Sequence, residues 1–405
     1  MQGLGKRSPS KSRDPVRVGL FGNFYPSTSH LSSHATGLAL LLSDLAHVER
    51  VLVIAPDGSK IPEKGASTKL TIIPSWQPGS VRGLIHAAAS LLRCSREVDL
   101  FIFDIYPPLF GRRNILRFGG MLLPVLLRIL SGKPVATYLH HLVGSLDLAQ
   151  LGYAPSAIQL TAASLVEAII AFGTTTFLPL MSQVTRANPV LRPKLNVLFL
   201  PFVEGVLVAR MLEGYGWNKV VGSCPLRLLL LGAWGPQKDL KSALIAVRTL
   251  VSEGVNIRLT IAGHVNTNLI RESADMSGLT AEFESSSVDF IFDPSEEKVA
   301  CLLATSAGVI LPYNTTGGPS GVLSMCALLG LPVIAYDVPP LREAARLLGA
   351  DVTFVPKRDV KAIEAAIITL LRDSALTKIV RPHLSSRIKA AKGAVRDLLE
   401  HALNS

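Results

Sequence analysis

Short apolar runs alternate with helix-like segments along most of the sequence, and this pattern leaves few possible folds. In the first half the clearest runs are residues 16–21, 50–55, 70–73, 99–104 and 133–139, with weaker ones at 174–178 and 196–200. Buried parallel strands are apolar on both faces and need a crossover helix between them. The repeated alternation therefore predicts a parallel sheet with helices on both faces.

The same pattern begins again at residues 227–231, which read "RLLLL". Further runs follow at residues 258–262, 288–292, 307–311, 332–335 and 351–355. We therefore expect an α/β protein with two doubly wound, Rossmann-like domains that face each other across a cleft. Because ligands of such sheets bind at the carboxyl ends of the strands, the cleft is the expected binding site.

Composition along the chain suggests where these domains begin and end. Residues 1–15 are polar and basic, and we expect them to form a disordered tail. The first domain is expected over residues 16–205 and the second over residues 226–380. Residues 206–225 are richer in glycine and polar side chains, which indicates a linker. Residues 381–405 form a final helical segment.

The charge balance indicates what kind of partner the protein binds. The 405-residue chain has 41 Lys and Arg against 30 Asp and Glu, a net charge of +11, which suits phosphate-rich ligands, anionic lipid or nucleic acid. Nucleic acid is not expected, because aromatic residues make up only 6% and no zinc-finger spacing or aromatic-rich RNA motif occurs. No cluster of His, Cys or acidic residues has metal-ligand spacing, so neither a metal nor a bound cofactor is expected.

The sequence predicts a cytoplasmic protein, and a peripheral position at the inner face of a membrane is compatible with it. Its four cysteines are far apart and form no CxxC, which favours reduced thiols. The start has no signal peptide, and no apolar run reaches the ~18–20 residues of a spanning helix. The closest run, residues 115–130, is interrupted by Arg117, Pro124 and Arg128. It fits either a basic amphipathic helix on an anionic membrane or a core helix of an α/β domain.

Residues 314–337, "NTTGGPSGVLSMCALLGLPVIAYD", predict a phosphate site. A glycine-rich turn opens into a short apolar helix that begins at Ser320 or Gly321. Gly317 and Gly318 allow the backbone to approach a ligand closely. The free amides at the start of the helix would bind an anion, and the helix dipole would help them.

A second candidate phosphate contact lies about 80 residues earlier in the chain. After the run at 227–231 the chain turns through Gly232 and Trp234 and reaches Lys238. A lysine beyond a glycine turn at the carboxyl edge of a sheet is well placed to meet a diphosphate. Together, Lys238 and the glycine-rich turn predict a donor site in the second half.

These two stretches carry a family resemblance. The segment "LLLLGAWGPQKDLKSALIAV" (residues 228–247) and the segment that ends "GLPVIAYDVPPLRE" resemble the family 4 glycosyltransferases, which have the GT-B fold. The resemblance covers most of the chain and is strongest in the second half. It implies a nucleotide-sugar donor, transfer with retention of anomeric configuration and no catalytic metal. It also implies that residues 381–405 return to pack on the first domain.

In its second half, the sequence departs from the family pattern at three positions. Lys238 matches the lysine of the family's Gly-Arg…Lys-Gly pattern, but Ala233 stands where the arginine usually is. Alignment on "GLPVI" places Gly317 and Met325 where the family has a pair of glutamates separated by seven residues. In the family the first glutamate lies near the sugar and the second binds ribose hydroxyls. The phosphate site itself rests on backbone amides and does not require them.

The resemblance also points to residues in the first half. His140 ends the run at 133–139, where the family often has a histidine near the transferred sugar, so it is the candidate catalytic residue. The loop and helix after the first strand line the acceptor side of the cleft. The candidates there are Asn23, Ser29, His30 and His34. Ser29 and His30 stand where the family has a pair of glycines.

The leading hypothesis is a retaining, metal-independent, hexosyltransferase-like enzyme of glycan biosynthesis. It would move a sugar from a nucleoside-diphosphate sugar to a cell-surface glycan or lipid-linked acceptor. Two alternatives stay open. One is a GT-B protein that binds sugar nucleotides but lost catalysis with its two glutamates. The other is a sugar-nucleotide epimerase, which would need acid and base side chains in the cleft.

Overall fold

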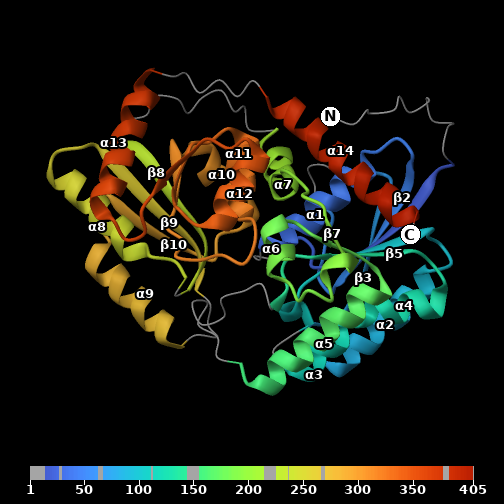
Figure 1. Cartoon of the computed structure of the whole chain (residues 1–405). Helices are drawn as coiled ribbons and strands as arrows, with labels where there is room; N and C mark the ends of the chain where they lie inside the picture. The colour runs from blue at the N-terminus through green and yellow to red at the C-terminus, as the bar shows by residue number, and fades with distance from the viewer. Residues whose placement is uncertain are drawn as a thin grey trace, which may run out of the picture.

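The computed structural model describes residues 14–26, 30–62, 67–110, 113–143, 155–213, 225–235, 237–265, 270–376 and 383–404. Two parallel sheets stand side by side, with a helical layer between them (Figure 1). This arrangement confirms the predicted α/β fold with two Rossmann-like sheets.

The first sheet has seven strands in the order β3-β2-β1-β4-β5-β6-β7, and every pair is parallel. The strands are β1 (Val16–Phe21), β2 (Val48–Pro56), β3 (Leu70–Trp76), β4 (Leu100–Ile105), β5 (Val135–Leu139), β6 (Thr175–Leu178) and β7 (Leu195–Val197). All residues of β4 and β5 are buried, as their uninterrupted apolar sequences predict. The strand order reverses direction between β1 and β4, so the ligand crevice of this half lies there.

The second sheet has six parallel strands in the order β10-β9-β8-β11-β12-β13. The strands are β8 (Leu226–Trp234), β9 (Ile257–Val265), β10 (Val288–Phe292), β11 (Gly308–Leu311), β12 (Val333–Tyr336) and β13 (Val352–Val355). The order reverses between β8 and β11. Gly232, which was predicted to lie in a turn, belongs to the last three residues of β8, and the glycine-rich turn at 314–320 follows β11. Both lie at this reversal.

The helices of the first half are α1 (His30–Ser43), α2 (Val81–Cys94), α3 (Asn114–Met121), α4 (Leu123–Ser131), α5 (Ala157–Gly173), α6 (Met181–Arg186) and α7 (Val203–Leu212), with 3₁₀ turns η1 (Pro107–Phe110) and η3 (Arg192–Lys194). The second half has α8 (Leu240–Ser252), α9 (Ile270–Phe283), α10 (Glu296–Thr305), α11 (Gly321–Leu329), α12 (Pro339–Leu348) and α13 (Val360–Leu376), and α14 (Leu384–Leu403) ends the chain. Among the described residues, no helix is long and apolar enough to cross a membrane.

Helix α7 corrects the predicted linker, because residues 206–212 are helical. Nine of its ten residues are buried, and it packs against α1, α10 and α11. Glycines permit these close contacts: a Cβ on Gly37 would lie 1.9 Å from the Val203 carbonyl oxygen, and one on Gly205 would lie 2.8 Å from Leu328. Residues 214–224 of the predicted linker lie outside the described part of the chain.

Helix α14 crosses the junction of the two halves and touches both (Figure 1). Lys392 pairs with Asp44 of the first half at 3.0 Å. Arg387 donates to the Leu328 carbonyl of α11 at 3.3 Å. The C-terminal helix therefore packs on α1 and also on α11.

The run at 115–130 is not one helix. It forms α3 and α4, which are separated at Leu122, just before the proline in the first turn of α4. Leu123 and Leu127 of α4 are buried, whereas Ile129 and Leu130 are 73% and 65% exposed. One face of α4 therefore belongs to the core, and the other is apolar and faces solvent.

Candidate functional site

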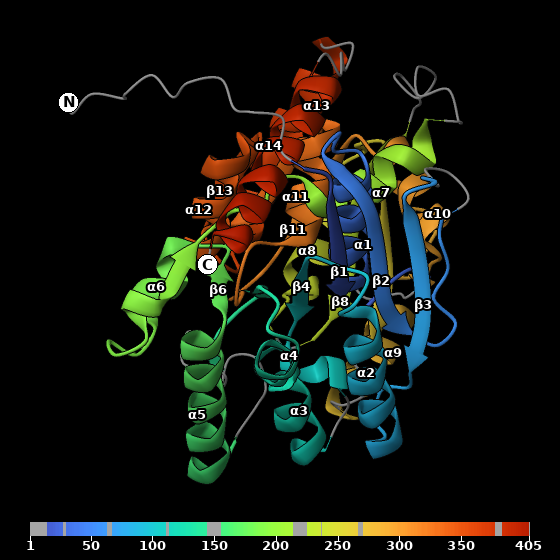
Figure 2. The ribbon, with the colours of Figure 1, turned by 90° about the vertical axis from the view of Figure 1, so that its right-hand side faces the viewer.

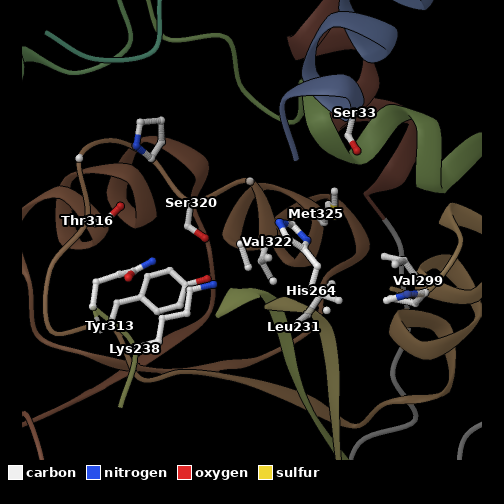
Figure 3. Close-up of a pocket in the computed structure, with 18 of the residues that line it drawn as sticks. Ser33, Leu231, Lys238, His264, Val299, Tyr313, Thr316, Ser320, Val322 and Met325 are labelled. Atoms are coloured by element: carbon white, nitrogen blue, oxygen red, sulfur yellow. The ribbon is translucent and has the colours of Figure 1, made fainter. Parts of the chain in front are cut away.

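A pocket lies between the two halves at the carboxyl ends of β8, β9, β10 and β11. Its lining comes mostly from the second half, and Ser33 of α1 closes it from the first half. Figure 3 shows Lys238, Tyr313, Thr316 and Ser320 at one end. Val299 and Ser33 lie toward the other end, with Val322, His264 and Met325 between.

Lys238 supplies the positive charge at the end of the pocket that also contains Tyr313 and Ser320. Its Nζ lies 5.0 Å from the Trp234 ring centre and 4.7 Å from that of Tyr313. Burial lowers the pKa of Lys238 to about 7. Among the described residues, no carboxylate lies within ion-pair distance of its Nζ. A cation held between aromatic rings without an acid partner is suited to receive an anionic ligand.

Two glycines make room for this lysine. Gly232 has φ 136°, and a Cβ there would lie 2.5 Å from Lys238 Nζ. Gly263, on the neighbouring strand, has φ 149°, and a Cβ there would lie 1.8 Å from the Gly232 carbonyl oxygen. The glycine turn predicted from the sequence therefore serves both backbone conformation and side-chain space.

The glycine-rich turn leads directly into α11 at the same end of the pocket. Ser320 is the N-cap of α11, and its side chain accepts a hydrogen bond from Leu323 N. The amides of Gly321 and Val322 are the first two of the helix, which leaves them without partners inside it. The first turn of α11 has no acidic residue. Gly317, Ser320 and Gly321 all line the pocket, as the prediction of a phosphate site requires.

The three departures from the family pattern also line the pocket: Ala233, Gly317 and Met325. Three acids of the chain that could have replaced the missing glutamates, Asp337, Glu343 and Glu204, do not line the pocket. Asp337 pairs with Arg342, Glu343 accepts hydrogen bonds from Met181 N and Ser182 N, and Glu204 is buried in α7.

Glu296 is a carboxylate of this pocket that the sequence reading missed. It opens α10 and accepts a hydrogen bond from Ser33 Oγ of the first half at 3.2 Å. Burial raises its pKa to about 7. Beside it, Glu297 accepts a hydrogen bond from Tyr25 Oη at 2.8 Å. These two bonds hold α10 against the first half on one side of the pocket.

On the other side, Gln183 joins the two halves. Its Nε2 donates to the His140 carbonyl oxygen and to the Gly317 carbonyl oxygen, each at 2.8 Å. A Cβ on Gly318 would lie 3.1 Å from both Gln183 Nε2 and the His140 oxygen. Gly318 therefore serves this close packing rather than lining the pocket. The side-chain amide of Gln183 therefore bridges the end of β5 at His140 and the predicted phosphate-binding turn at Gly317.

His140 does not itself line the pocket. Its Nε2 lies 2.6 Å from Asp104 Oδ1, and its side chain is 15% exposed. Burial lowers the pKa of its neighbour His141 to about 4, with a smaller effect from His140. Asp104 lies at the carboxyl end of a buried strand, as His140 does. The rule that polar residues at such strand ends are candidate site residues could therefore have identified Asp104 from the sequence.

The acceptor-side predictions have mixed outcomes. His34 is buried in α1, with its Nδ1 3.1 Å from Asp104 Oδ2, so the predicted contact with an acceptor is wrong. Asn23 lies half-buried just after β1. His30 is the first residue of α1. Ser29 and the His30 side chain lie outside the described residues.

Comparisons with known proteins agree with this fold. Residues 225–373 match the family model described as glycosyl transferases group 1. HepE of Anabaena, crystallised with UDP and glucose, has a TM-score of 0.62 at 10% identity over 96% of this chain and 100% of that chain. Sucrose-phosphate synthase of Thermosynechococcus elongatus gives 0.60 at 14% identity over 96% and 98%.

A putative UDP-N-acetylglucosamine 2-epimerase of Listeria monocytogenes has a TM-score of 0.56 at 12% identity, over 96% of this chain and 97% of that chain. No curated protein sequence matches the chain. The fold is GT-B, and the part that carries the pocket matches the glycosyl transferases group 1.

Proposed function

We propose that this protein is a glycosyltransferase that moves a sugar from a nucleoside-diphosphate sugar to an acceptor with retention of configuration. The observation that carries the proposal is Lys238, a cation without an acid partner among the described residues, at the same end of one pocket as the start of α11. A diphosphate fits between a cation and free helix amides. HepE, a structural neighbour, has been crystallised with UDP-glucose.

The chemistry we propose uses this positive end to stabilise the leaving group. The bond between the sugar's anomeric carbon and the diphosphate oxygen breaks, and the acceptor oxygen bonds to that carbon on the same face. The acceptor proton passes to the departing phosphate oxygen. Lys238 and the amides of Gly321 and Val322 stabilise the charge that develops on the diphosphate. They supply the positive charge that a metal would otherwise give, so we propose that transfer is metal-independent.

A thermal-shift experiment tests the donor site. Lys238→Met removes the charge and keeps an apolar chain between the rings, while Lys241→Met removes an exposed lysine three residues away on α8. A nucleoside diphosphate that binds the folded protein raises its melting temperature by mass action. We expect one diphosphate to raise it in the wild type and in Lys241→Met, and to raise it clearly less in Lys238→Met, which keeps the helix amides but lacks the charge. Equal shifts in all three proteins would contradict the proposal.

A non-catalytic sugar-nucleotide-binding protein is the second candidate, and the absence of carboxylates at Gly317 and Met325 favours it. The two candidates differ in turnover. If the protein binds a nucleotide sugar but releases no nucleoside diphosphate with any acceptor or with water, it is a binding protein. Conversion of the nucleotide sugar to its epimer without an acceptor would instead identify an epimerase.

For the acceptor we propose a lipid-linked glycan at the cytoplasmic face of an anionic membrane. Helices α2, α3, α4 and α5 lie together on the outer side of the first sheet (Figure 2). We call their outer side the α2–α5 face. The most exposed large apolar side chains of these helices are Val81, Ile85, Leu126, Ile129, Leu130, Ile158, Leu165 and Phe172.

Charge on the α2–α5 face supports the same partner. The four helices contain Arg82, Arg93, Arg117 and Arg128. Their one acid is Glu167, which is buried and accepts a hydrogen bond from Val143 N. Apolar side chains among arginines, with no exposed acid on these helices, suit a surface of anionic lipid headgroups.

Co-sedimentation with vesicles tests this partner. We expect the protein to bind vesicles that contain phosphatidylserine, and to bind phosphatidylcholine vesicles weakly. Ile129→Ser with Phe172→Ser should reduce that binding, because both side chains are exposed on the α2–α5 face. The control is Leu347→Ser, which changes an exposed apolar residue on α12 in the other half. Equal binding by the double variant and the control would contradict the membrane proposal.

A further inference from the structure

Asp104 lies at the centre of a buried cluster in the first half. Its Oδ1 is 2.6 Å from His140 Nε2, and its Oδ2 is 3.1 Å from His34 Nδ1. The Asp104 side chain is 1% exposed and that of His34 is 3% exposed, so His140 is the member that reaches solvent. The cluster joins α1 to the carboxyl ends of β4 and β5, beside the crevice of the first sheet.

The carboxylate decides which ring nitrogens carry hydrogen. An ionised carboxylate only accepts hydrogen bonds, so each nitrogen that faces Asp104 must donate. His140 is therefore protonated on Nε2. A neutral imidazole carries one hydrogen, which leaves His140 Nδ1 with a free electron pair.

His34 supplies the positive charge that faces the Asp104 carboxylate inside the cluster. Burial alone would lower the pKa of His34, but the negative charges of Asp104 and Glu204 outweigh it and raise that pKa. Burial would likewise raise the pKa of Asp104, but the two imidazoles hold it well below its usual range. Tyr138 stacks on the His34 ring at 5.1 Å and fixes its plane. A charged His34 and an ionised Asp104 cancel, and a buried charge needs such a partner.

The same strand end is tied to the predicted donor site. The His140 carbonyl oxygen and the Gly317 carbonyl oxygen share the Gln183 amide. The two rings of the histidine pair meet edge to face at 4.7 Å, so neither turns without moving the other. The cluster therefore controls both the position and the tautomer of His140 where the two halves meet.

We propose that Asp104 and His34 are positioning residues that hold His140 with Nε2 protonated, which leaves Nδ1 to accept a hydrogen bond from a substrate hydroxyl. The identity of the substrate in this inference rests on the proposed function. The tautomer of His140 is independent of the proposed function. A hydroxyl that donates to Nδ1 is oriented with its oxygen lone pairs toward the reacting sugar.

Nitrogen-15 NMR of the histidine rings tests the tautomer without any substrate. We expect the neutral form of wild-type His140 to show a protonated Nε2 and an unprotonated Nδ1, because Nε2 faces the Asp104 carboxylate. In Asp104→Asn the amide cannot accept from both rings, so the His140 or His34 ring signals should change. The matched control is Asp99→Asn, which changes the carboxylate just before the other end of the same strand, where it pairs with Arg17. A wild-type His140 protonated on Nδ1 would overturn the proposal, even if Asp104→Asn failed to fold.

Kinetics and metal analysis complete the test. Asp104→Asn should lower turnover by about 10²-fold or more while the nucleotide still raises the melting temperature. The three ligand atoms also lie within 4.8 Å of one another, a spacing that a metal ion could occupy. Stoichiometric transition metal in the purified protein, lost in Asp104→Asn, would overturn the hydrogen-bond assignment. If no nucleotide binds at all, the proposed function fails and the NMR result still decides the tautomer.

Discussion

Single residues decide the chemistry of the donor site, and Lys238 is the most informative of them. A lysine ordinarily has a pKa near ~10.4. Burial lowers that of Lys238 to about 7, so the free protein holds this proton far less firmly than it holds that of an exposed lysine. A diphosphate beside Nζ favours the charged form and raises the pKa again. Binding therefore takes up protons above that pKa.

We predict this proton uptake from the direction of the shift. Near pH 8, about one unit above the pKa of Lys238 in the free protein, nucleoside diphosphate binding should take up close to one proton. Calorimetry in two buffers of different ionisation enthalpy measures that number. Lys238→Met should remove the part due to Lys238 and leave the part due to Glu296, whose pKa is also about 7. Equal uptake by wild type and Lys238→Met would refute the assignment.

The lowered pKa of Lys238 also makes the stability of the folded protein depend on pH. The unfolded chain keeps the Lys238 proton up to about pH 10.4, whereas the folded chain releases it near pH 7. Between these values the unfolded state binds more protons, so this group makes stability rise with pH. Lys238→Met lacks that contribution, and its melting temperature relative to wild type should fall across the window.

Helices and strands could be predicted where the local sequence pattern determines the structure. The predictions failed where contacts with distant parts of the chain determine it. The strands were predictable, because each is a short apolar run, and α11 was predictable from its glycine turn. The sequence predicts a linker over residues 206–212, because the segment that follows is rich in glycine. They form a helix because α1, α10 and α11 bury them. The Asp104 cluster was missed because it joins residues 36 and 70 positions apart.

Helix packing at this junction predicts opposite effects for two glycine substitutions. Gly37→Ala would force a Cβ to 1.9 Å from the Val203 carbonyl oxygen, so α1 and α7 must separate. We expect a loss of about 1–3 kcal/mol in the free energy of unfolding. Gly393→Ala on α14 has open space around its Cβ and should gain about 0.4–1 kcal/mol. Urea unfolding compares them, and a Gly37→Ala protein as stable as wild type would show that the contact is not rigid.

At the scale of the whole molecule, the two halves meet around one pocket and are tied on both sides of it. Ser33 and Tyr25 bind Glu296 and Glu297 on one side. On the other, Gln183 bridges the strand end at His140 and the turn at Gly317, and Glu343 caps the start of α6. The fold could be predicted because both sheets repeat one pattern. These ties could not, because each joins residues from distant parts of the chain.

The central claim is that this pocket holds a diphosphate between Lys238 and the start of α11. A crystal structure with the nucleoside diphosphate that gives the largest thermal shift tests it most directly. The account predicts phosphate oxygens within hydrogen-bond distance of Lys238 Nζ and of the Gly321 and Val322 amides. It also predicts the nucleoside toward His264 and Glu296. A diphosphate bound elsewhere, or density for the nucleoside alone with Lys238 uncontacted, would contradict it.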